Sequence, residues 1–153
     1  MPSRRDLIKM TPEEVDAFLH ETHTMNVATI GRDGRPHLVA MWYGFLDDAP
    51  AFWTFGKSQK IVNLKRDPRI TCLVEDGDEY SQLRGVELVG KGTIITDKDA
   101  IVAIGLSTSQ RHTGGDPEAA RPFVEAQAEK RVGVRIEVEQ VVSWDHRKLG
   151  GRY

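Results

Sequence analysis

Six stretches rich in β-branched and aromatic residues, separated by turns of Gly, Asp and Pro, constrain the fold of this chain most strongly. They are MNVATIG (25–31), HLVAMWYGFLD (37–47), AFWTFG (51–56), RITCLVED (69–76), GVELVGKGTIITD (85–97) and RVGVRIEVEQVVSW (131–144). In the last stretch, valine or isoleucine alternates with glycine or charged residues, as in a strand with one buried face. Because exposed strand edges are unfavourable, six mostly antiparallel strands favour a small barrel or a strongly coiled sheet.

The connections between these strands can also be predicted. The turns GRDGRP and DDAP join the first three strands, so we expect a three-stranded antiparallel meander there. The paired glycines of VGKG indicate a bend or bulge in the fifth strand. We expect the sixth strand to complete the sheet. No long linker divides the chain, and residues 1–153 are expected to form a single domain.

Helices are expected at four places around the sheet. The first runs from the capping residue Thr11, followed by Pro12, to about Glu21. The second, SQKIVNLKRD, stops at Pro68. Two more are expected within 98–130, one through AIVAIGLSTSQ and one from about 118 to 130, with TGGDP between them. The predicted fold class is therefore mainly β with flanking helices.

The charge and composition of the chain exclude several classes of protein. The net charge of −2 marks neither a nucleic-acid binder nor a membrane-surface protein, so any anion site must be local. The single cysteine, Cys72, excludes a disulfide framework and is expected to be a buried thiol. No His pair has metal-ligand spacing with a third partner, so we expect no metal. With no signal sequence and no apolar run of about 18 residues, we expect a cytoplasmic protein.

A candidate anion site lies where the third strand meets the second helix. The chain there reads FGKSQK, with Lys57 and Lys60 on either side of Ser58, a suitable N-cap residue. The first amides of a helix and its dipole favour an anion, and two lysines add charge at the same place. The segment could bind a phosphate, or it could be a capped surface helix with solvated lysines. No GxGxxG or Walker motif is present, so a Rossmann fold and a nucleoside triphosphatase are not indicated.

Aromatic residues lead directly into this junction. Two groups, one on either side of the DDAP turn, could line a flat heterocycle or could belong to the core: Met41, Trp42 and Tyr43, and Trp53, Thr54 and Phe55. Because the second group ends at Lys57, a flat ring with a phosphate tail fits both parts of the site.

The order of these motifs resembles the split β-barrel flavin and deazaflavin oxidoreductases, relatives of pyridoxamine 5′-phosphate oxidase. The resemblance covers about residues 11–150 and rests most on KSQKxxNLxRDPR, AMWY and SWDHRKLG. These motifs are most similar to the branch that uses coenzyme F420, a 5-deazaflavin. The resemblance implies a six-stranded split barrel that forms a homodimer, with two cofactor sites at the subunit interface.

The resemblance also implies roles for individual residues. Lys57, Ser58 and Lys60 correspond to the phosphate-binding segment, supported by Asn63 one helical turn beyond Lys60. FMN oxidases typically have Ser-Arg-Lys here, and Gln59 replaces that arginine, which weakens the FMN interpretation. The remaining cofactor-binding residues implied by the resemblance are Met41, Trp42, Tyr43 and Thr54 along the ring, and Trp144 and Arg147 near the partner's cofactor.

A deazaflavin carries out two-electron hydride transfer, so the protein needs to bind, orient and shield rather than to supply a nucleophile. We therefore expect hydride transfer between reduced F420 and a small organic acceptor. Tyr43 or His112 could supply a proton to the reduced product. Residues that select the acceptor are expected within 80–86 and 104–115, and those that give this surface its partly apolar character are Tyr80, Leu83, Ile104, Leu106 and His112.

Two other functions remain open from the sequence. One is an FMN-dependent enzyme like pyridoxamine-phosphate oxidase. The other is a carrier that binds a deazaflavin, a flavin or haem without turnover. A nucleic-acid role is the least favoured, because the few basic residues are offset by acidic ones.

Overall fold

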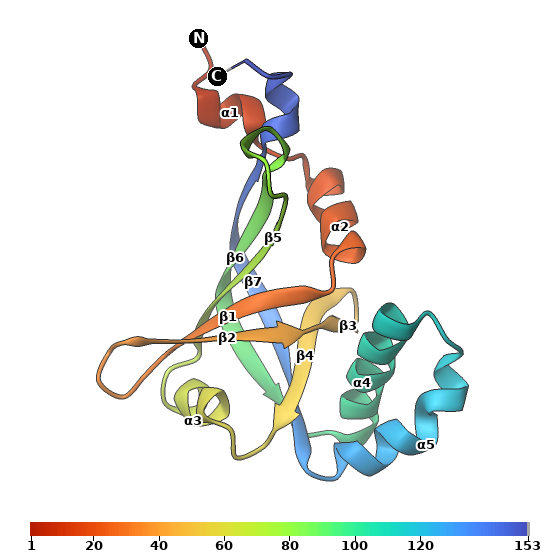
Figure 1. The fold of residues 1–153 in the computed structure, drawn as a ribbon. Helices are drawn as coiled ribbons and strands as arrows, with labels where there is room; N and C mark the ends of the chain where they lie inside the picture. Colours follow the sequence, from red (N-terminus) through yellow and green to blue (C-terminus); the bar gives the residue numbers. More distant parts are fainter. Residues whose placement is uncertain (153) are drawn as a thin grey trace.

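A computed structural model describes residues 1–152 of the protein, and Figure 1 shows a curled antiparallel sheet with helices around it. The strands are β1 (Thr24–Ile30), β2 (Pro36–Trp42), β3 (Gly44–Leu46), β4 (Ala49–Phe55), β5 (Arg69–Asp76), β6 (Arg84–Ile95) and β7 (Arg131–Asp145). They lie in the order β2-β1-β5-β6-β7-β4-β3. The architecture is the half-barrel of a split-barrel protein, as the sequence predicted.

In the described residues, 1–152, the sheet has seven strands rather than six because the predicted strand 37–47 is interrupted at Tyr43. β2 pairs with β1, whereas β3 pairs with β4, so consecutive segments lie at opposite edges of the sheet. The prediction of a three-stranded meander was therefore wrong. The cause is the burial of Tyr43: its side chain is 0% exposed, and its hydroxyl donates to the Leu19 carbonyl (2.6 Å).

The second half of the chain follows the predicted pattern more closely. β7 pairs with both β6 and β4 and so completes the sheet. The register of β6 against β7 shifts between Val89 and Gly90, which confirms the predicted bulge. A Cβ on Gly90 would lie 2.0 Å from the Glu137 carbonyl oxygen, so only glycine permits this approach of the two strands.

Within residues 1–152, five α-helices and two short 3₁₀ helices surround the sheet. They are α1 (Arg4–Ile8), α2 (Pro12–Glu21), α3 (Gln59–Arg66), η1 (Tyr80–Gln82), α4 (Lys98–Thr113), α5 (Pro117–Ala128) and η2 (His146–Leu149). α2 begins with a capping box between Thr11 and Glu14, and α1 was not predicted. In Figure 1, α3 lies at the lower end of the barrel, α4 and α5 lie beside β4, and α1 and η2 lie at the opposite end.

The apolar core has two parts. The larger fills the barrel and includes Phe52, Ile61 and Cys72, and the smaller lies between α4, α5 and β4. Burial raises the pKa of the Cys72 thiol to about 12, which confirms the predicted buried thiol. The second core cluster holds α4 and α5 against the outer surface of the barrel, where β4 presents Trp53 to them.

Replacing Tyr43 with Phe tests whether the buried hydroxyl stabilises the break between β2 and β3. Arg111 Nη2 also donates to the Leu19 carbonyl, so that oxygen keeps a partner in the variant. We therefore expect Tyr43→Phe to lower the free energy of unfolding by only about 1 kcal/mol. Urea denaturation followed by circular dichroism would measure the change. An unchanged unfolding midpoint would contradict a stabilising role of the hydroxyl.

Candidate functional site

The junction between β4 and α3 presents an incompletely capped helix N-terminus. Ser58 is at the predicted N-cap position, but its side chain makes no capping hydrogen bond. Instead, Ser58 Oγ accepts a 3.4 Å hydrogen bond from Thr54 Oγ1. The first amides of α3 are therefore not used by a side-chain cap and point out of the helix end, where the dipole favours an anion. The predicted helix boundary is correct, whereas the predicted role of the serine hydroxyl is not.

Lys60, in the first turn of α3, is buried inside the end of the barrel. Its side chain is 8% exposed, and Nζ donates to Thr54 Oγ1 over 3.0 Å. Among residues 1–152, no carboxylate lies within ion-pair distance of Lys60, and burial lowers its pKa below the ordinary value of 10.5. A buried lysine with only a hydroxyl partner is suited to receive an anion.

Further polar side chains surround Lys60 at this end of the barrel. Asn63 Nδ2 donates to Thr29 Oγ1 of β1 (3.1 Å), so α3 is tied to β1 as well as to β4. We call the four buried residues Thr29, Thr54, Lys60 and Asn63 the α3 polar cluster. Asn63 also accepts from Gln59 and Arg66, so its contacts within the chain are structural, and its predicted role in cofactor binding stays a prediction.

His37 is a polar residue of this region that the sequence analysis did not single out. It lies directly across β1 and β2 from Thr29, so both side chains face the same side of the sheet. His37 Nδ1 is buried and has no hydrogen-bond partner among residues 1–152. In β2, the side chains of His37, Val39 and Met41 are less exposed than their neighbours. The position of His37 in this alternating pattern was the only indication that its side chain faces the interior.

The opposite face of β4 carries a different kind of surface. Trp53 and Phe55 point outward, and the Arg131 guanidinium lies 4.7 Å from the centroid of each ring. A hollow of about 440 Å³ runs from this point between β4, α4 and α5, lined by residues that include Trp42, Trp53, Gly105, His112, Phe123 and Arg131. Within it, the rings of Trp42 and His112 stack at 3.8 Å.

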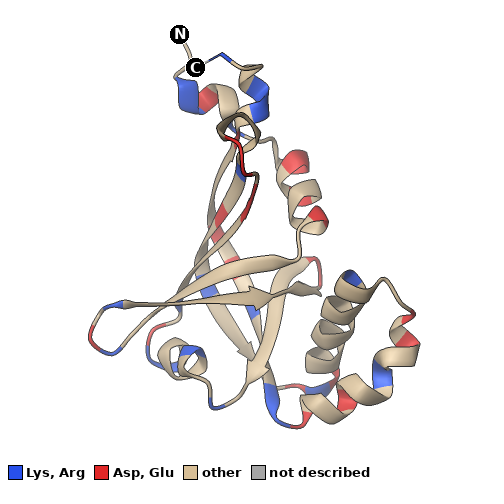
Figure 2. Ribbon diagram, viewed as in Figure 1, with Lys and Arg blue, Asp and Glu red and all other residues tan. Residues whose placement is uncertain are grey.

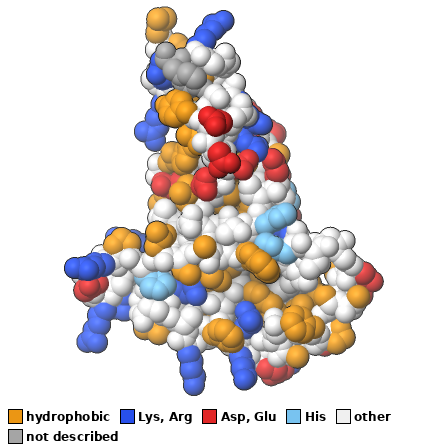
Figure 3. Space-filling view, in the orientation of Figure 1, with side chains coloured by type: hydrophobic (Ala, Val, Ile, Leu, Met, Phe, Trp, Pro, Cys, Tyr) orange, Lys and Arg blue, Asp and Glu red, His pale blue; other side chains and the backbone are white. Residues whose placement is uncertain are grey.

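A second hollow, of about 640 Å³, continues from Arg131 past Phe55 to Lys57 at the start of α3. Because both hollows are lined by Arg131, we treat them as one outer groove with an aromatic part and a basic part. Figure 3 shows hydrophobic side chains gathered on this face beside Lys and Arg side chains. The basic part corresponds to the blue segments in the loop before α3 and at the start of β7 in Figure 2, whereas α2 and the β5–β6 turn carry acidic residues.

The structure does not bring the side chains of the four predicted ring-lining residues to one surface. Trp42 is 60% exposed and faces the outer groove, whereas Met41 packs against the core and Thr54 belongs to the α3 polar cluster. Tyr43 is fully buried, and its hydroxyl is held by Leu19 and Thr22. That placement argues against Tyr43 as the proton donor. His112 lines the groove, and burial lowers its pKa.

The residues predicted to select the acceptor fall into two separate regions. Within 104–115, Gly105, Thr108 and His112 line the outer groove. Ile104 is fully buried, and Leu106 packs against the second core cluster, so their side chains are structural. The segment 80–86, with Tyr80 and Leu83, contacts η2 at the end of the molecule opposite α3, away from the groove (Figure 1).

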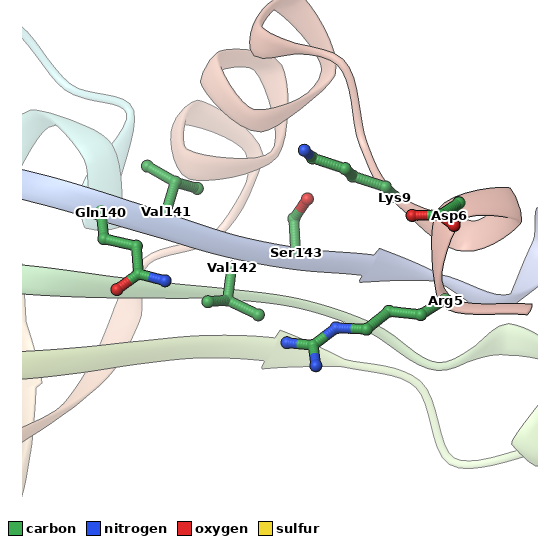
Figure 4. Close-up of a pocket in the computed structure, with 7 residues that line it drawn as sticks. All are labelled: Arg5, Asp6, Lys9, Gln140, Val141, Val142 and Ser143. Atoms are coloured by element: carbon green, nitrogen blue, oxygen red, sulfur yellow. The ribbon is translucent and has the colours of Figure 1, made fainter. Parts of the chain in front are cut away.

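Trp144 and Arg147 also lie at the end of the molecule opposite α3. Trp144 is at the end of β7, and Arg147 in η2 forms a bidentate pair with the buried carboxylate of Asp145 (2.8 and 2.9 Å). A smaller hollow of about 210 Å³, shown in Figure 4, lies nearby between α1 and β7. The Ser143 hydroxyl in this hollow accepts a hydrogen bond from the Met10 amide. The hollow therefore lies where the N-terminal segment packs against β7.

Two negative findings limit the chemistry of the described chain. In residues 1–152, no group of three or more His, Cys, Asp or Glu side chains is placed to hold a metal ion. No helix in that range is long and apolar enough to cross a membrane.

Comparison with known proteins identifies the family. The family described as pyridoxamine 5′-phosphate oxidase matches residues 11–145, nearly the whole chain. The chain belongs to this family. Its fold is accordingly that of the split-barrel flavin and deazaflavin oxidoreductases, and the α3 polar cluster and outer groove lie on that scaffold.

Three relatives of this oxidase-family chain are informative. The F420H(2)-dependent biliverdin reductase of Mycobacterium tuberculosis is 31% identical over 119 residues, which cover 76% of this chain and 83% of the relative. The crystal structure of the conserved hypothetical protein Rv2991 from the same organism is 44% identical, with a TM-score of 0.93 and coverage of 99% and 95%. A solved F420 reductase is 25% identical, with a TM-score of 0.64 and coverage of 86% and 98%.

Gln59 lies between Lys57 and Lys60, in the segment that the resemblance to the oxidase family implies for phosphate binding. Its Nε2 donates to Asn63 Oδ1 over 2.8 Å, along the surface of α3. Lys57 and Lys60 are thus the cations that the first turn of α3 offers. An ammonium group binds a phosphate as a point charge, whereas an arginine at position 59 would add a bidentate partner.

Replacing Lys60 with Met should stabilise the ligand-free protein near neutral pH. The folded protein lowers the pKa of Lys60, so the unfolded state binds more protons between that lowered pKa and about 10.5. Wild-type stability should therefore rise with pH across this interval, and the rise should be smaller in Lys60→Met. Urea midpoints measured between about pH 7 and 10 would show it. The matched control is Lys65→Met, because Lys65 is exposed on the last turn of the same helix.

Gly105 fixes the position of the Trp53 ring in the groove. A Cβ at residue 105 would lie 2.7 Å from both the Trp53 ring and Val124 Cγ1. Alanine normally stabilises a helix interior by about 1 kcal/mol over glycine. Here we expect Gly105→Ala to destabilise the protein instead, by about 1–3 kcal/mol, and to alter the near-ultraviolet circular dichroism of tryptophan. A more stable variant would contradict this packing.

Proposed function

We propose that the protein is an F420-dependent oxidoreductase that transfers a hydride between reduced cofactor and a small organic acceptor. The observation that carries this proposal is Lys60, a buried cation with no carboxylate partner in residues 1–152, beside an uncapped helix N-terminus. Lys57, three residues before Lys60, is exposed just before the start of α3 and adds a second charge to this segment. Together they suit the phosphate of a cofactor.

The relatives support F420 rather than FMN as that cofactor. The biliverdin reductase that covers most of this chain is F420H(2)-dependent, and the solved relative at 25% identity is an F420 reductase. The family description names pyridoxamine 5′-phosphate oxidase and no cofactor. At the site itself, Gln59 stands where FMN oxidases have arginine, and its amide is directed to Asn63. The competing FMN assignment therefore lacks one phosphate ligand.

When bound, the reduced deazaflavin supplies the hydride, and the chain's own residues bind, orient and shield. Lys57, Lys60 and the first amides of α3 would hold the phosphate, and His37 Nδ1 adds an unused polar atom on the same side of the sheet. The aromatic part of the outer groove would exclude water from the acceptor. His112 is the remaining candidate for proton delivery, since the Tyr43 hydroxyl is buried within the fold.

We further propose that two copies of the chain form the functional unit, with the cofactor site at their interface. The support is an exposed apolar strip on β2, where Leu38 and Trp42 are 68% and 60% exposed, and a second on β7 at Val138 and Val141. The C-terminal Trp144 and Arg147 would then reach the partner's cofactor rather than that of their own chain. Size-exclusion chromatography with light scattering would test this, and a monomer would contradict it.

Fluorescence titration of the purified protein with F420 and, separately, with FMN tests the cofactor assignment. We expect tighter binding of F420, and binding weaker by at least about tenfold in Lys60→Ala, because a charge-assisted hydrogen bond contributes roughly 1.5–3 kcal/mol. Lys57→Ala should have a smaller effect, because Lys57 is exposed. Lys65→Ala, at the other end of α3, is the matched control and should bind as wild type does.

Two outcomes would redirect the assignment. A preference for FMN would place the protein with the oxidases and mean that Gln59 was misinterpreted. Binding without reduction of any acceptor, across enones, quinones and biliverdin, would favour a carrier.

A further inference from the structure

We propose that Arg131 binds a carboxylate of the acceptor, and that the acceptor is therefore a flat molecule with an acidic substituent. The proposal rests on the proposed function, since it names the substrate class of the same enzyme. It concerns the outer groove, not the α3 polar cluster that is assigned to the cofactor.

Arg131 is a charged group without a counter-ion. Within residues 1–152, its guanidinium forms no ion pair and no hydrogen bond, and its Nε is buried without a partner. Three other partly buried arginines have partners for their charge: Arg84 pairs with Glu21 and Asp76, and Arg111 donates to main-chain carbonyls. Arg135 Nε is also buried without a hydrogen bond, but it lies 3.7 Å from the Glu137 carboxylate. Arginine stays charged even when burial lowers its pKa, as it does here. The unsatisfied charge indicates an anion supplied from outside the chain.

The packing of Arg131 presents its N–H groups in a fixed direction. The guanidinium lies over the rings of Trp53 and Phe55, with 4.7 Å to each centroid. Residues 131 and 55 are directly opposite each other in the β4–β7 ladder, so the stacking is set by strand register. A guanidinium stacked on aromatic rings keeps its in-plane N–H edge available, and that edge matches the two oxygens of a carboxylate.

The residues that line the groove around Arg131 favour a ligand with a flat, apolar ring system. Trp42, Trp53 and Phe123 line the aromatic part of the groove, with the small residues Gly105, Thr108 and Ser109 of α4 on one side. None of its lining residues is acidic. Its other titratable group is His112, and burial favours the neutral form of that imidazole. Arg131 is thus the cation at which an aromatic acceptor with one carboxylate would be oriented.

The carboxylate could instead come from the glutamate tail of the cofactor, and the surroundings favour the acceptor. A flexible tail with several carboxylates requires several cations in a solvated setting. Arg131 lines both parts of the groove. It is the one Lys or Arg among the described residues of the aromatic part, where it lies against two rings, whereas Lys57 and Lys130 lie in the basic part together with Glu129. The two sources can be separated by experiment, because each predicts a different ligand whose affinity depends on Arg131.

Calorimetric titration with 2-naphthoate and 2-naphthamide tests the charge requirement without cofactor or turnover. These probes have the same flat shape and differ in the charged group. We expect 2-naphthoate to bind at least tenfold more tightly than the amide, and Arg131→Gln to remove that preference. Arg131→Lys, which keeps the charge but loses the planar fork, should retain part of it. The matched control is Arg121→Gln on α5, where the arginine pairs with Glu118 outside the aromatic part of the groove.

The same variants, titrated with F420, distinguish failure of this proposal from failure of the proposed function. Wild-type F420 affinity in Arg131→Gln, together with lost naphthoate preference, supports the acceptor assignment. A tenfold loss of F420 affinity in Arg131→Gln would overturn it and assign Arg131 to the cofactor tail. Equal binding of the two naphthalene probes, or no binding of either, would also overturn it. If the protein prefers 2-naphthoate to 2-naphthamide but does not bind F420, the result would support the anion site at Arg131 and contradict the assignment of F420 as the cofactor.

Reduction kinetics with biliverdin and its dimethyl ester extend the test to turnover. The ester keeps the chromophore and removes the two carboxylates. For the wild type we expect the ester to raise KM at least tenfold with little change in kcat, and for Arg131→Gln we expect the two substrates to have similar KM values. An ester effect of the same size in both proteins would contradict the role of Arg131.

Discussion

The hydrogen bond from the buried Tyr43 hydroxyl to the Leu19 carbonyl fixes the point at which the barrel splits. It anchors the chain between β2 and β3 to the end of α2, so that one run of residues supplies both edges of the sheet. Arg111 reinforces the same point from α4, where it donates to the Tyr43 and Leu19 carbonyls and lies over the Tyr43 ring. The divergence of β2 from β4 follows from this anchor, and α3 lies at the end of the barrel below it (Figure 1).

Because side chains alternate along a strand, the two faces of β4 contribute to two different regions, the α3 polar cluster and the outer groove. Thr54 points inward to Lys60, while Trp53 and Phe55 point outward to Arg131. The interior cluster is buried and polar, and we propose that it contributes to phosphate binding. The exterior groove is aromatic, and we propose that it holds a flat ring. Three consecutive residues thus contribute to both sites, and a one-residue slip in register would exchange their environments.

Much of the fold and part of the site could be predicted from the sequence. Most strand segments and the bulge at Gly90 follow local rules of alternation and glycine geometry, so these predictions were correct. The start of α3 was also placed correctly at Ser58, although the serine side chain does not cap the helix. Tyr43 was misassigned because a strand pattern does not show which residue is anchored by a distant helix. Arg131 was missed because its significance is the lack of a partner, which only tertiary packing shows. His37 was missed for the same reason.

The separation of the two sites has a consequence for specificity. The α3 polar cluster depends on β1, β4 and α3, whereas the aromatic part of the groove depends on β4, β7 and the α4–α5 pair. Within the groove, Trp53 connects α4 to β7, because it lies against Gly105 on one side and against the Arg131 guanidinium on the other. A substitution on α4 or α5 that moves the indole would shift Arg131, the cation that we propose orients the acceptor. Lys60 has no contact with the indole and would keep its hydrogen bond to Thr54, so under the proposed assignments acceptor preference would change while the cofactor site is retained.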